Sequence, residues 1–281
     1  MVEHESAPTT KSGGDLTKHS IFKSMFRGSD DESSEEESSD DSDADEARAS
    51  ASTTAAAAAG TDPNDEISAY EAIHHDFRIL LRQERKKGIA HQLWPAATFL
   101  SHYLEQHAST LLSTDTSVVE LGAGIGLCGL VCHKLQARHV FLTDLPVAVP
   151  LLDANIALNC AGDDESRIHA AVLGWGSATD LAAVMAQMPA NGPRLCIAAD
   201  CVYWEELFEP FFETVRALVV DHGVDVILAH VKRWKRDEKF FKLCRKHMTV
   251  TQLVEDVGVE MNEHTQASQR VIKRIFRLSA K

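Results

Sequence analysis

The sequence has no run of 18 consecutive apolar residues, and its N-terminus has no apolar signal core. These absences argue against a membrane-spanning helix and predict a soluble protein of the cytoplasm, or of the cytoplasm and nucleus. The six cysteines form no Cys-x-x-Cys pair, and most of them lie in apolar runs, where buried thiols are common. We therefore expect reduced thiols, no disulfide framework and no metal site.

Basic residues are scarce as well. The chain of 281 residues has 28 Lys and Arg against 42 Asp and Glu, which gives a formal net charge of −14. Residues 1–60 hold 14 acidic and 5 basic side chains, so residues 61–281 have a net charge of only −5. This balance disfavours a protein that binds nucleic acid over its whole surface, although it is compatible with a local basic patch.

The first part of the chain lacks the apolar residues that a core needs. Between Ser29 and Glu46 there are 11 carboxylates, no basic residue and no apolar side chain larger than alanine, and an Ala/Ser-rich stretch follows. Such a segment buries too little surface to offset the entropy lost on ordering. We predict a disordered acidic tail and linker over residues 1–63 and one domain over residues 64–281. The simplest role for the tail is a solubilising spacer; the alternative is that serines preceding its carboxylates are phosphorylated.

Within the domain, short β-branched or aromatic runs alternate with helical patterns. Such alternation predicts right-handed β-α-β units and a parallel sheet covered on both faces. The expected strands are 117–121, 139–143, 168–172, 195–199, 224–230, 250–257 and 271–278, and the expected helices between them are 125–135, 146–160, 178–188, 205–220 and 235–247. The last two strands should pair antiparallel, because no helix separates them. A strand over 77–83 and a helix over 95–106, which caps the site, are expected before this unit. The predicted fold class is α/β and Rossmann-like, with a mostly parallel seven-stranded sheet and a terminal antiparallel hairpin.

A glycine-rich segment, E-L-G-A-G-I-G-L-C-G from Glu120 to Gly129, stands where a predicted strand becomes a helix. Glycines let the backbone approach a ligand closely, and the helix N-terminus presents free N–H groups. The segment contains the G-x-G-x-x-G pattern of dinucleotide-binding proteins, with Asp144 at a suitable distance to bind ribose hydroxyls. However, Glu120 would repel a pyrophosphate, whereas it could hold the ammonium group of a methionine moiety. The segment therefore favours S-adenosylmethionine over NAD; a tight turn without a ligand is the third interpretation.

Four further motifs accompany this segment. They are G-I-A-H-Q-L-W-P-A-A at 88–97, T-D-L-P at 143–146, L-G-W-G at 173–176 and A-A-D-C-V-Y at 198–203. With these motifs, the sequence from about Asp76 to Leu278 resembles the class I, seven-stranded methyltransferases, and among them the family-16 lysine-methyltransferase-like group. One departure is Ile125, where that family often has Thr. The resemblance implies the class I fold, S-adenosyl-L-methionine as cofactor and a protein substrate that presents a lysine.

The motifs supply the candidate site, and each aromatic or acidic residue has a structural alternative. Trp94 could pack over the methionine end of the cofactor or staple its helix to the sheet, and Trp175 could cover the adenine or pack in the core. Asp144 could bind two ribose hydroxyls or cap a helix. The expected cofactor-binding residues are Trp94, Glu120, Gly122, Ala123, Gly124, Asp144, Trp175 and Ala199, and the expected catalytic residues are Asp200 and Tyr203.

Asp200 and Tyr203 stand where the resemblance places the acceptor amine. Methyl transfer to nitrogen needs a neutral amine, and a free lysine has a pKa of about 10.4, so neutralising it at pH 7 costs about 4.6 kcal/mol. The sulfonium charge and a partly apolar channel would lower the amine pKa, while Asp200 orients the N–H bonds and Tyr203 forms a wall of the channel. We expect alignment of the two reactants, rather than a dedicated base, to contribute most.

Two basic stretches bear on the substrate. Lys232 to Lys242 interleaves basic and aromatic residues, as nucleic-acid-binding segments do, but we interpret it as an exposed helix face with Trp234 and Phe241 turned inward. Four basic residues of the last strand are interpreted as protection of a sheet edge: Arg270, Lys273, Arg274 and Arg277. The expected protein is a monomeric protein-lysine methyltransferase that binds neither membranes nor nucleic acid. A methyltransferase acting on a small molecule or nucleic acid, and a non-catalytic binding module with the same fold, are the alternatives.

Overall fold

The computed structural model describes residues 66–160, 165–189, 191–261 and 268–281. The acidic tail predicted over residues 1–63 lies outside the described residues. None of the helices within them is long and apolar enough to cross a membrane. All six cysteines are free and buried, as the sequence predicted.

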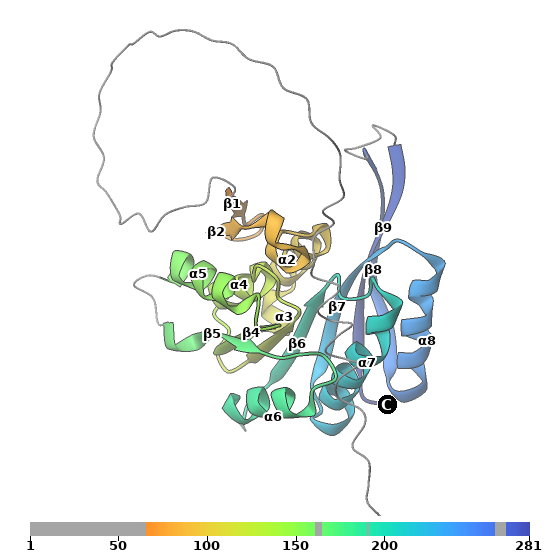
Figure 1. The fold of residues 1–281 in the computed structure, drawn as a ribbon. Coiled ribbons are helices and arrows are strands. Elements are labelled where there is room, and N and C mark those ends of the chain that lie inside the picture. Colours follow the sequence, from red (N-terminus) through yellow and green to blue (C-terminus); the bar gives the residue numbers. More distant parts are fainter. Residues whose placement is uncertain (1–65, 161–164, 190, 262–267) are drawn as a thin grey trace, which may run out of the picture. The chain divides into compact units, whose positions relative to one another are not determined.

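A seven-stranded sheet forms the centre of the domain (Figure 1). Its strands are β3 (Ser117–Leu121), β4 (His139–Asp144), β5 (Ile168–Val172), β6 (Arg194–Ala199), β7 (Asp225–Lys232), β8 (Thr249–Met261) and β9 (Ser268–Ser279). They lie in the order β5-β4-β3-β6-β7-β9-β8. The first five strands in this order, β5, β4, β3, β6 and β7, pair in parallel. β9 is antiparallel to both β7 and β8. The predicted fold, a mostly parallel sheet with a terminal antiparallel hairpin, is confirmed.

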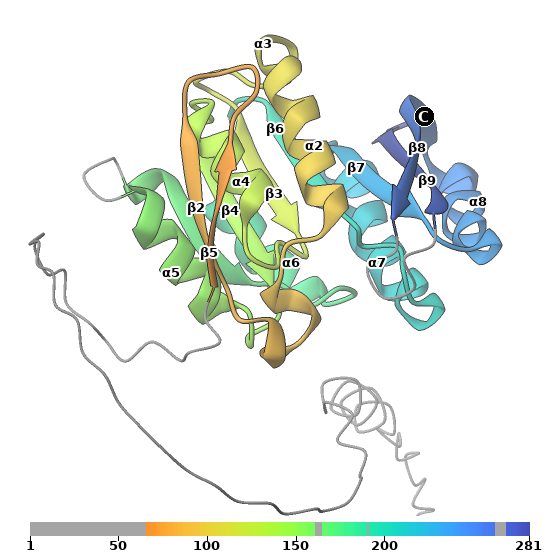
Figure 2. The ribbon, with the colours of Figure 1, turned by 90° about the horizontal axis from the view of Figure 1, so that it is seen from above.

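Helices cover both faces of the sheet (Figures 1 and 2). One face carries α2 (Pro95–Gln106), α4 (Leu127–Lys134) and α5 (Val149–Cys160), and the other carries α6 (Ala178–Gln187), α7 (Phe208–Arg216) and α8 (Glu238–His247). Two hydrophobic cores result, and the neighbouring residues Val118 and Val119 of β3 belong to different ones. This division follows from the alternation of side chains along a strand. The short elements are α3 (Ala108–Leu111), η1 (Arg85–Lys87), η2 (Ile89–His91), η3 (Glu165–Arg167), η4 (Glu205–Leu207), η5 (Ala217–Asp221) and η6 (Lys235–Asp237).

An N-terminal hairpin was only half predicted. β1 (Glu66–Glu71) pairs antiparallel with β2 (Arg78–Gln83), and only the second strand was expected. In β1 only Tyr70 is buried, so this strand has almost no apolar pattern. Figure 2 shows the hairpin beside α4 and α5, on the same face of the sheet.

The interpretation of residues 232–242, an exposed helix face with Trp234 and Phe241 turned inward, is confirmed for Phe241 and wrong for Trp234. Trp234 precedes η6 and is 44% exposed, with the guanidinium of Arg236 4.5 Å from the ring centroid, so it does not turn inward. Phe241 fills the core as predicted, and Phe240 lies in the core beside it.

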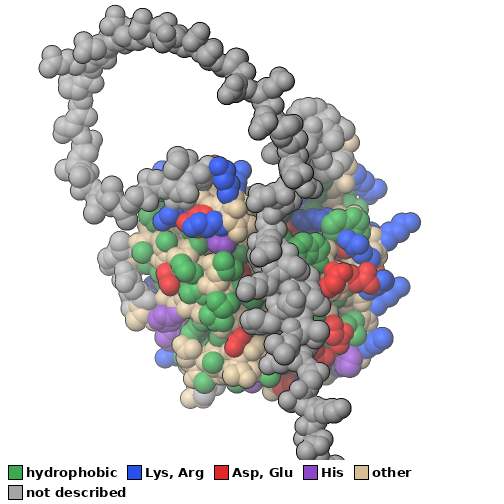
Figure 3. Space-filling view, viewed as in Figure 1, with side chains coloured by type: hydrophobic (Ala, Val, Ile, Leu, Met, Phe, Trp, Pro, Cys, Tyr) green, Lys and Arg blue, Asp and Glu red, His purple; other side chains and the backbone are tan. Residues whose placement is uncertain are grey.

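The last strand, β9, is not a sheet edge, because it lies between β7 and β8. Edge protection is therefore not the role of Arg270, Lys273, Arg274 and Arg277. Arg274 instead forms ion pairs with Glu238 and Glu255, and Arg277 with Asp225. Figure 3 shows basic and acidic side chains interspersed on this side of the domain.

Candidate functional site

The glycine segment forms a turn between β3 and α4 that no other residue type would adopt easily. Gly122, Gly124 and Gly126 have φ values of +62°, +57° and +86°, in the left-handed region that favours glycine. A Cβ atom on Gly122 would lie 2.8 Å from Cζ2 of Trp175. The turn is fixed to the next strand, because the N–H of Ala123 donates to the carbonyl of Thr143 at 3.0 Å. Gly122 and Gly124 are half-buried and carry no side chain, whereas Ala123 and Gly126 are buried.

Asp144 ends β4 and directs its carboxylate towards the same turn. Oδ2 accepts the N–H of Gly124 at 2.8 Å, and Oδ1 accepts the N–H of Leu145 at 2.7 Å. Burial raises the pKa of Asp144, while these two N–H donors and then His91 act to lower it. A carboxylate has about four lone-pair sites, so Asp144 has acceptor capacity left for hydroxyl groups. It is not the N-cap of α5, which begins only at Val149.

One aromatic side chain, Trp175, contacts the turn, and two more belong to the segment before and at the start of α2. Trp175 lies next to Gly122, and its ring centroid is 4.7 Å from that of Phe211. Trp94 precedes α2, and its Nε1–H donates to the carbonyl of Ile89 at 2.9 Å. His91, which the sequence analysis did not single out, is 2% exposed, and its Nδ1 atom has no hydrogen-bond partner among the described residues. Its place in the tryptophan-containing motif was the only sequence signal for it.

The candidate catalytic pair follows β6. Ala199 ends that strand, and Asp200 is one of two residues other than glycine with positive φ, at +60°, among the described residues. A left-handed conformation costs such a residue about 1–3 kcal/mol and is often found at functional sites. Burial, and then the charges of Cys201, Asp144 and Asp200, raise the pKa of Tyr203, so this side chain is a neutral phenol. Both carboxylates at the site therefore lie close enough to Tyr203 to affect it.

An arginine that the sequence analysis did not assign to the site is paired with Asp200. Nη1 of Arg233 donates to Oδ1 of Asp200 at 2.6 Å, and Nη2 donates to Oδ2 at 2.5 Å. Arg233 directly follows β7, which neighbours β6 in the sheet. The position of a basic residue one place after a central strand was the available signal, but that segment was interpreted only as an exposed face.

Glu120 lies beneath the turn rather than on its open side. Its Oε2 accepts the N–H of Gly129 at 2.8 Å, and the residue is 2% exposed. Burial raises the pKa of Glu120 to about 8, against the opposing effect of its hydrogen bonds with Gly129 and Cys128. In this structure Glu120 therefore supports the first turn of α4. Its contact with a methionine ammonium stays a prediction.

The chemistry of this edge fits S-adenosylmethionine. The glycine turn offers half-buried backbone without side chains at Gly122 and Gly124, Asp144 offers acceptors for a ribose diol, and Trp175 offers an aromatic surface. The carboxylate of Asp144, which lies against the turn, disfavours a pyrophosphate and therefore a dinucleotide. When bound, S-adenosylmethionine supplies a methyl group on a positively charged sulfur.

Comparisons with known proteins assign the family. Residues 74–247 match the model of a family described as lysine methyltransferases. The protein-lysine N-methyltransferase EFM6 of Saccharomyces cerevisiae is 30% identical over 67% of this chain and 83% of its own length. The EEF1A lysine methyltransferase 3 of Mus musculus is 30% identical over 72% of this chain and 83% of its own length. The protein N-lysine methyltransferase METTL21A of Xenopus tropicalis is 28% identical over 71% of this chain and 86% of its own length.

The matched region, 74–247, contains every residue of the candidate site, from Trp94 to Tyr203 and Arg233. It also contains all five motifs, which lie between residues 88 and 203. The chain therefore belongs to the lysine methyltransferase family and is an S-adenosylmethionine-dependent protein-lysine N-methyltransferase.

Proposed function

We propose that the carboxyl edge of β3, β4 and β6 is the active site, with the cofactor on the β4 side and the acceptor lysine at Asp200 and Tyr203. The observation that carries this proposal is the convergence of separate motifs: Gly124 bonds Asp144, Gly122 lies against Trp175, and Asp144 and Asp200 both act on Tyr203. Ligands of open α/β sheets bind at this edge. The residues proposed to contact the cofactor are Trp94, Gly122, Ala123, Gly124, Asp144, Trp175 and Ala199, with Glu120 supporting the turn.

The proposed role of Asp200 is to accept N–H bonds of the amine and so aim the nitrogen lone pair at the methyl group. Tyr203, a neutral phenol, limits the channel without adding a charge. Neither residue has to remove a proton in the transfer step, because the reacting amine is already neutral. Positioning of aligned reactants accounts for the largest share of the rate in this scheme.

The proposed substrate is a protein with an accessible lysine, modified by a monomeric enzyme in the cytoplasm or nucleus. The arginines of β9 support a protein rather than a nucleic acid, because Arg274 and Arg277 are already paired with acidic side chains. EEF1A, which the name of the mouse relative contains, is the first purified protein to assay.

The test is transfer of labelled methyl from S-adenosylmethionine into an extract of the source cells, followed by acid hydrolysis. Label should appear as methyl-lysine in one or a few proteins with the wild type and with Glu206→Ala, an exposed acidic control near the site. With Asp200→Ala the transfer should fall by about a hundredfold, the scale of a misaligned reactant. S-adenosylhomocysteine affinity, measured by calorimetry, should stay within a few-fold in Asp200→Ala and be lost in Gly122→Asp.

Unchanged transfer by Asp200→Ala would remove this residue from the active site. Normal calorimetric affinity in Gly122→Asp would place the cofactor elsewhere. If nuclease releases the label in soluble form and protease does not, the substrate is a nucleic acid and not a protein.

A further inference from the structure

Both oxygens of the Asp200 carboxylate accept a hydrogen bond from the same side chain. Arg233 contacts both oxygens through parallel N–H bonds of 2.6 and 2.5 Å. The Asp200 side chain is 5% exposed and the Arg233 side chain 27% exposed, so the carboxylate is buried while the guanidinium reaches the surface. Paired bonds of this kind fix the orientation of a carboxylate more strictly than a single contact does.

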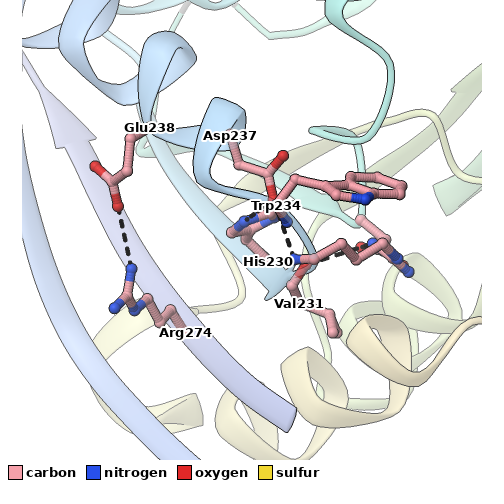
Figure 4. A network of polar contacts seen from close by, with 8 residues as sticks. His230, Val231, Trp234, Asp237, Glu238 and Arg274 are labelled. Atoms are coloured by element: carbon pink, nitrogen blue, oxygen red, sulfur yellow. Dashed lines mark hydrogen bonds and ion pairs between the residues drawn. The ribbon is translucent and has the colours of Figure 1, made fainter. Parts of the chain in front are cut away.

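The backbone that carries Arg233 is itself held in place. Oδ2 of Asp237 accepts the N–H groups of Arg233 and Trp234, both at 3.1 Å. Nε2 of His230 lies 3.4 Å from the same oxygen, and His230 and Asp237 are both buried. Figure 4 shows Asp237 directed towards His230 and the start of η6. The backbone of Arg233 is thus held by a buried anchor, and its guanidinium is held by the two bonds to Asp200.

We infer that Arg233 is a positioning residue for methyl transfer: it holds the Asp200 carboxylate and balances its charge, so that the acceptor lysine is bound as a neutral amine. This inference rests on the proposed role of Asp200. The guanidinium uses one lone pair on each oxygen, and a carboxylate has about four such sites. Asp200 can therefore still accept N–H bonds from an amine while the pair has no net charge.

Without Arg233 the Asp200 carboxylate would favour the protonated form of the acceptor lysine. An unpaired anion beside the lysine favours the protonated ammonium and raises its pKa, and an ammonium has no lone pair for the transfer. The charged or titratable groups around the pair lie on neighbouring elements: Asp200 and Asp237 act on Arg233, and Asp144, Cys201 and Asp200 act on Tyr203. Arg233 is the cation among them, and its hydrogen bonds with Asp200 raise its own pKa, so it stays charged.

The test measures the pH dependence of the initial rate of methyl-lysine formation with full-length protein. The acceptor is a dialysed protein extract of the source cells, assayed between pH 6.5 and 9.5 with saturating labelled S-adenosylmethionine. For Arg233→Ala we expect the acid limb of the profile to move up by about one pH unit, a tenfold loss at pH 7 that is recovered at high pH. Arg233→Lys should restore part of the shift, because it returns the charge without the paired geometry. Lys235→Ala, an exposed cation of the same turn, should keep the wild-type profile.

A purely structural role for Arg233 predicts a different result. The rate of Arg233→Ala would then fall by the same factor at every pH, and that outcome, or an unchanged rate, would overturn the inference. Asp200→Ala is assayed in parallel. Loss of rate in Asp200→Ala without a shift in Arg233→Ala refutes only the role of Arg233, whereas no loss in Asp200→Ala refutes the proposed active site. Thermal unfolding and S-adenosylhomocysteine affinity are measured for each variant to establish that it is folded. If Arg233→Ala does not fold, the pH profile of Arg233→Lys is compared with that of the wild type.

Discussion

Glu120 illustrates how burial changes what one carboxyl group can do. It is fixed to the N–H of Gly129 beneath the glycine turn, in a part of the core that also contains Cys128. Burial raises its pKa from 4.5 to about 8, so the folded protein retains a proton there at neutral pH. A protonated carboxyl group has no charge with which to attract a methionine ammonium. Direct electrostatic recognition through Glu120 would require this group to lose its proton when the cofactor binds.

The raised pKa of Glu120 predicts a pH-dependent stability. Between pH 4.5 and about 8 the folded state holds a proton that the unfolded state has released. The contribution of Glu120 to the free energy of unfolding is therefore complete below pH 4.5 and is lost as the pH rises through 8. The slope of this loss is at most about 1.4 kcal/mol per pH unit. Glu120→Gln keeps an acceptor for Gly129 and removes this titration. Urea unfolding at pH 6, 7 and 8 should show a flatter profile for Glu120→Gln, and the wild-type slope for the exposed control Glu209→Gln. Equal slopes in Glu120→Gln and wild type would mean that Glu120 is ionised in the folded protein.

At the residue scale, the sequence predicted single site residues more reliably than the contacts that these residues make. Asp144, Asp200 and the glycines were found because each ends a strand or fills a turn where only a few residue types serve. Arg233 and His91 were not assigned, because their importance depends on which strands become neighbours. The pairing of Arg233 with Asp200 requires β7 to lie beside β6, a relation between segments that a local pattern does not contain.

At the scale of elements, two asparagines of α5 attach the N-terminal hairpin to the domain. The amide of Asn159 exchanges two hydrogen bonds of 2.8 Å with the backbone of Leu80, and Asn155 exchanges bonds of 2.8 and 3.2 Å with Arg82. These amides form hydrogen bonds with backbone groups on the edge of β2 that β1 does not cover. Asn155 also donates to the carbonyl of Ile125, in the glycine turn, at 2.9 Å. One side chain thus connects the hairpin, α5 and the cofactor loop.

Asn155→Leu should weaken both the fold and the cofactor site. The substitution removes three hydrogen bonds from a residue that is fully buried, and each buried group left without a partner costs about 1–3 kcal/mol. We expect the free energy of unfolding to fall by at least about 2 kcal/mol and S-adenosylhomocysteine affinity to fall with it. Denaturant unfolding and calorimetry are the measurements, with Asp153→Ala, exposed on the same helix, as control. Wild-type affinity in Asn155→Leu would show that the contact with Ile125 does not position the turn.

Most elements were predictable because their patterns are strong. β3 is buried at every position, and β4, β6 and β7 are almost entirely buried, so each appears as an apolar run in the sequence. β1 was missed because one buried side chain, Tyr70, gives no periodicity. The predicted helix over 205–220 is divided into η4, α7 and the π-helical turn η5, a change of hydrogen-bond register that composition does not reveal.

At the scale of the whole molecule, the acidic charge is unevenly distributed along the sequence. Residues 1–60 carry a net charge of −9 and residues 61–281 a net charge of −5. Both hydrophobic cores, and every residue of the proposed site, lie between Tyr70 and Leu278. We predict from its sequence that the acidic segment is a disordered tail. Its expected contribution is long-range electrostatics, which salt screens over about 8–10 Å at ordinary ionic strength.

A fragment of residues 64–281 should consequently fold and methylate the same protein as the full chain. We expect its thermal unfolding midpoint to lie within a few degrees of that of the full chain, and its transfer of labelled methyl to agree within a few-fold at 200 mM salt. A difference in rate that appears at 50 mM salt and vanishes at 200 mM would assign the tail an electrostatic role in substrate encounter, because screening weakens such steering. Sedimentation equilibrium of the full chain should give a monomer of 30.9 kDa. A fragment that unfolds, or that stays inactive at both salt concentrations, would show that the domain boundary lies before residue 64 and that the tail contributes to the fold.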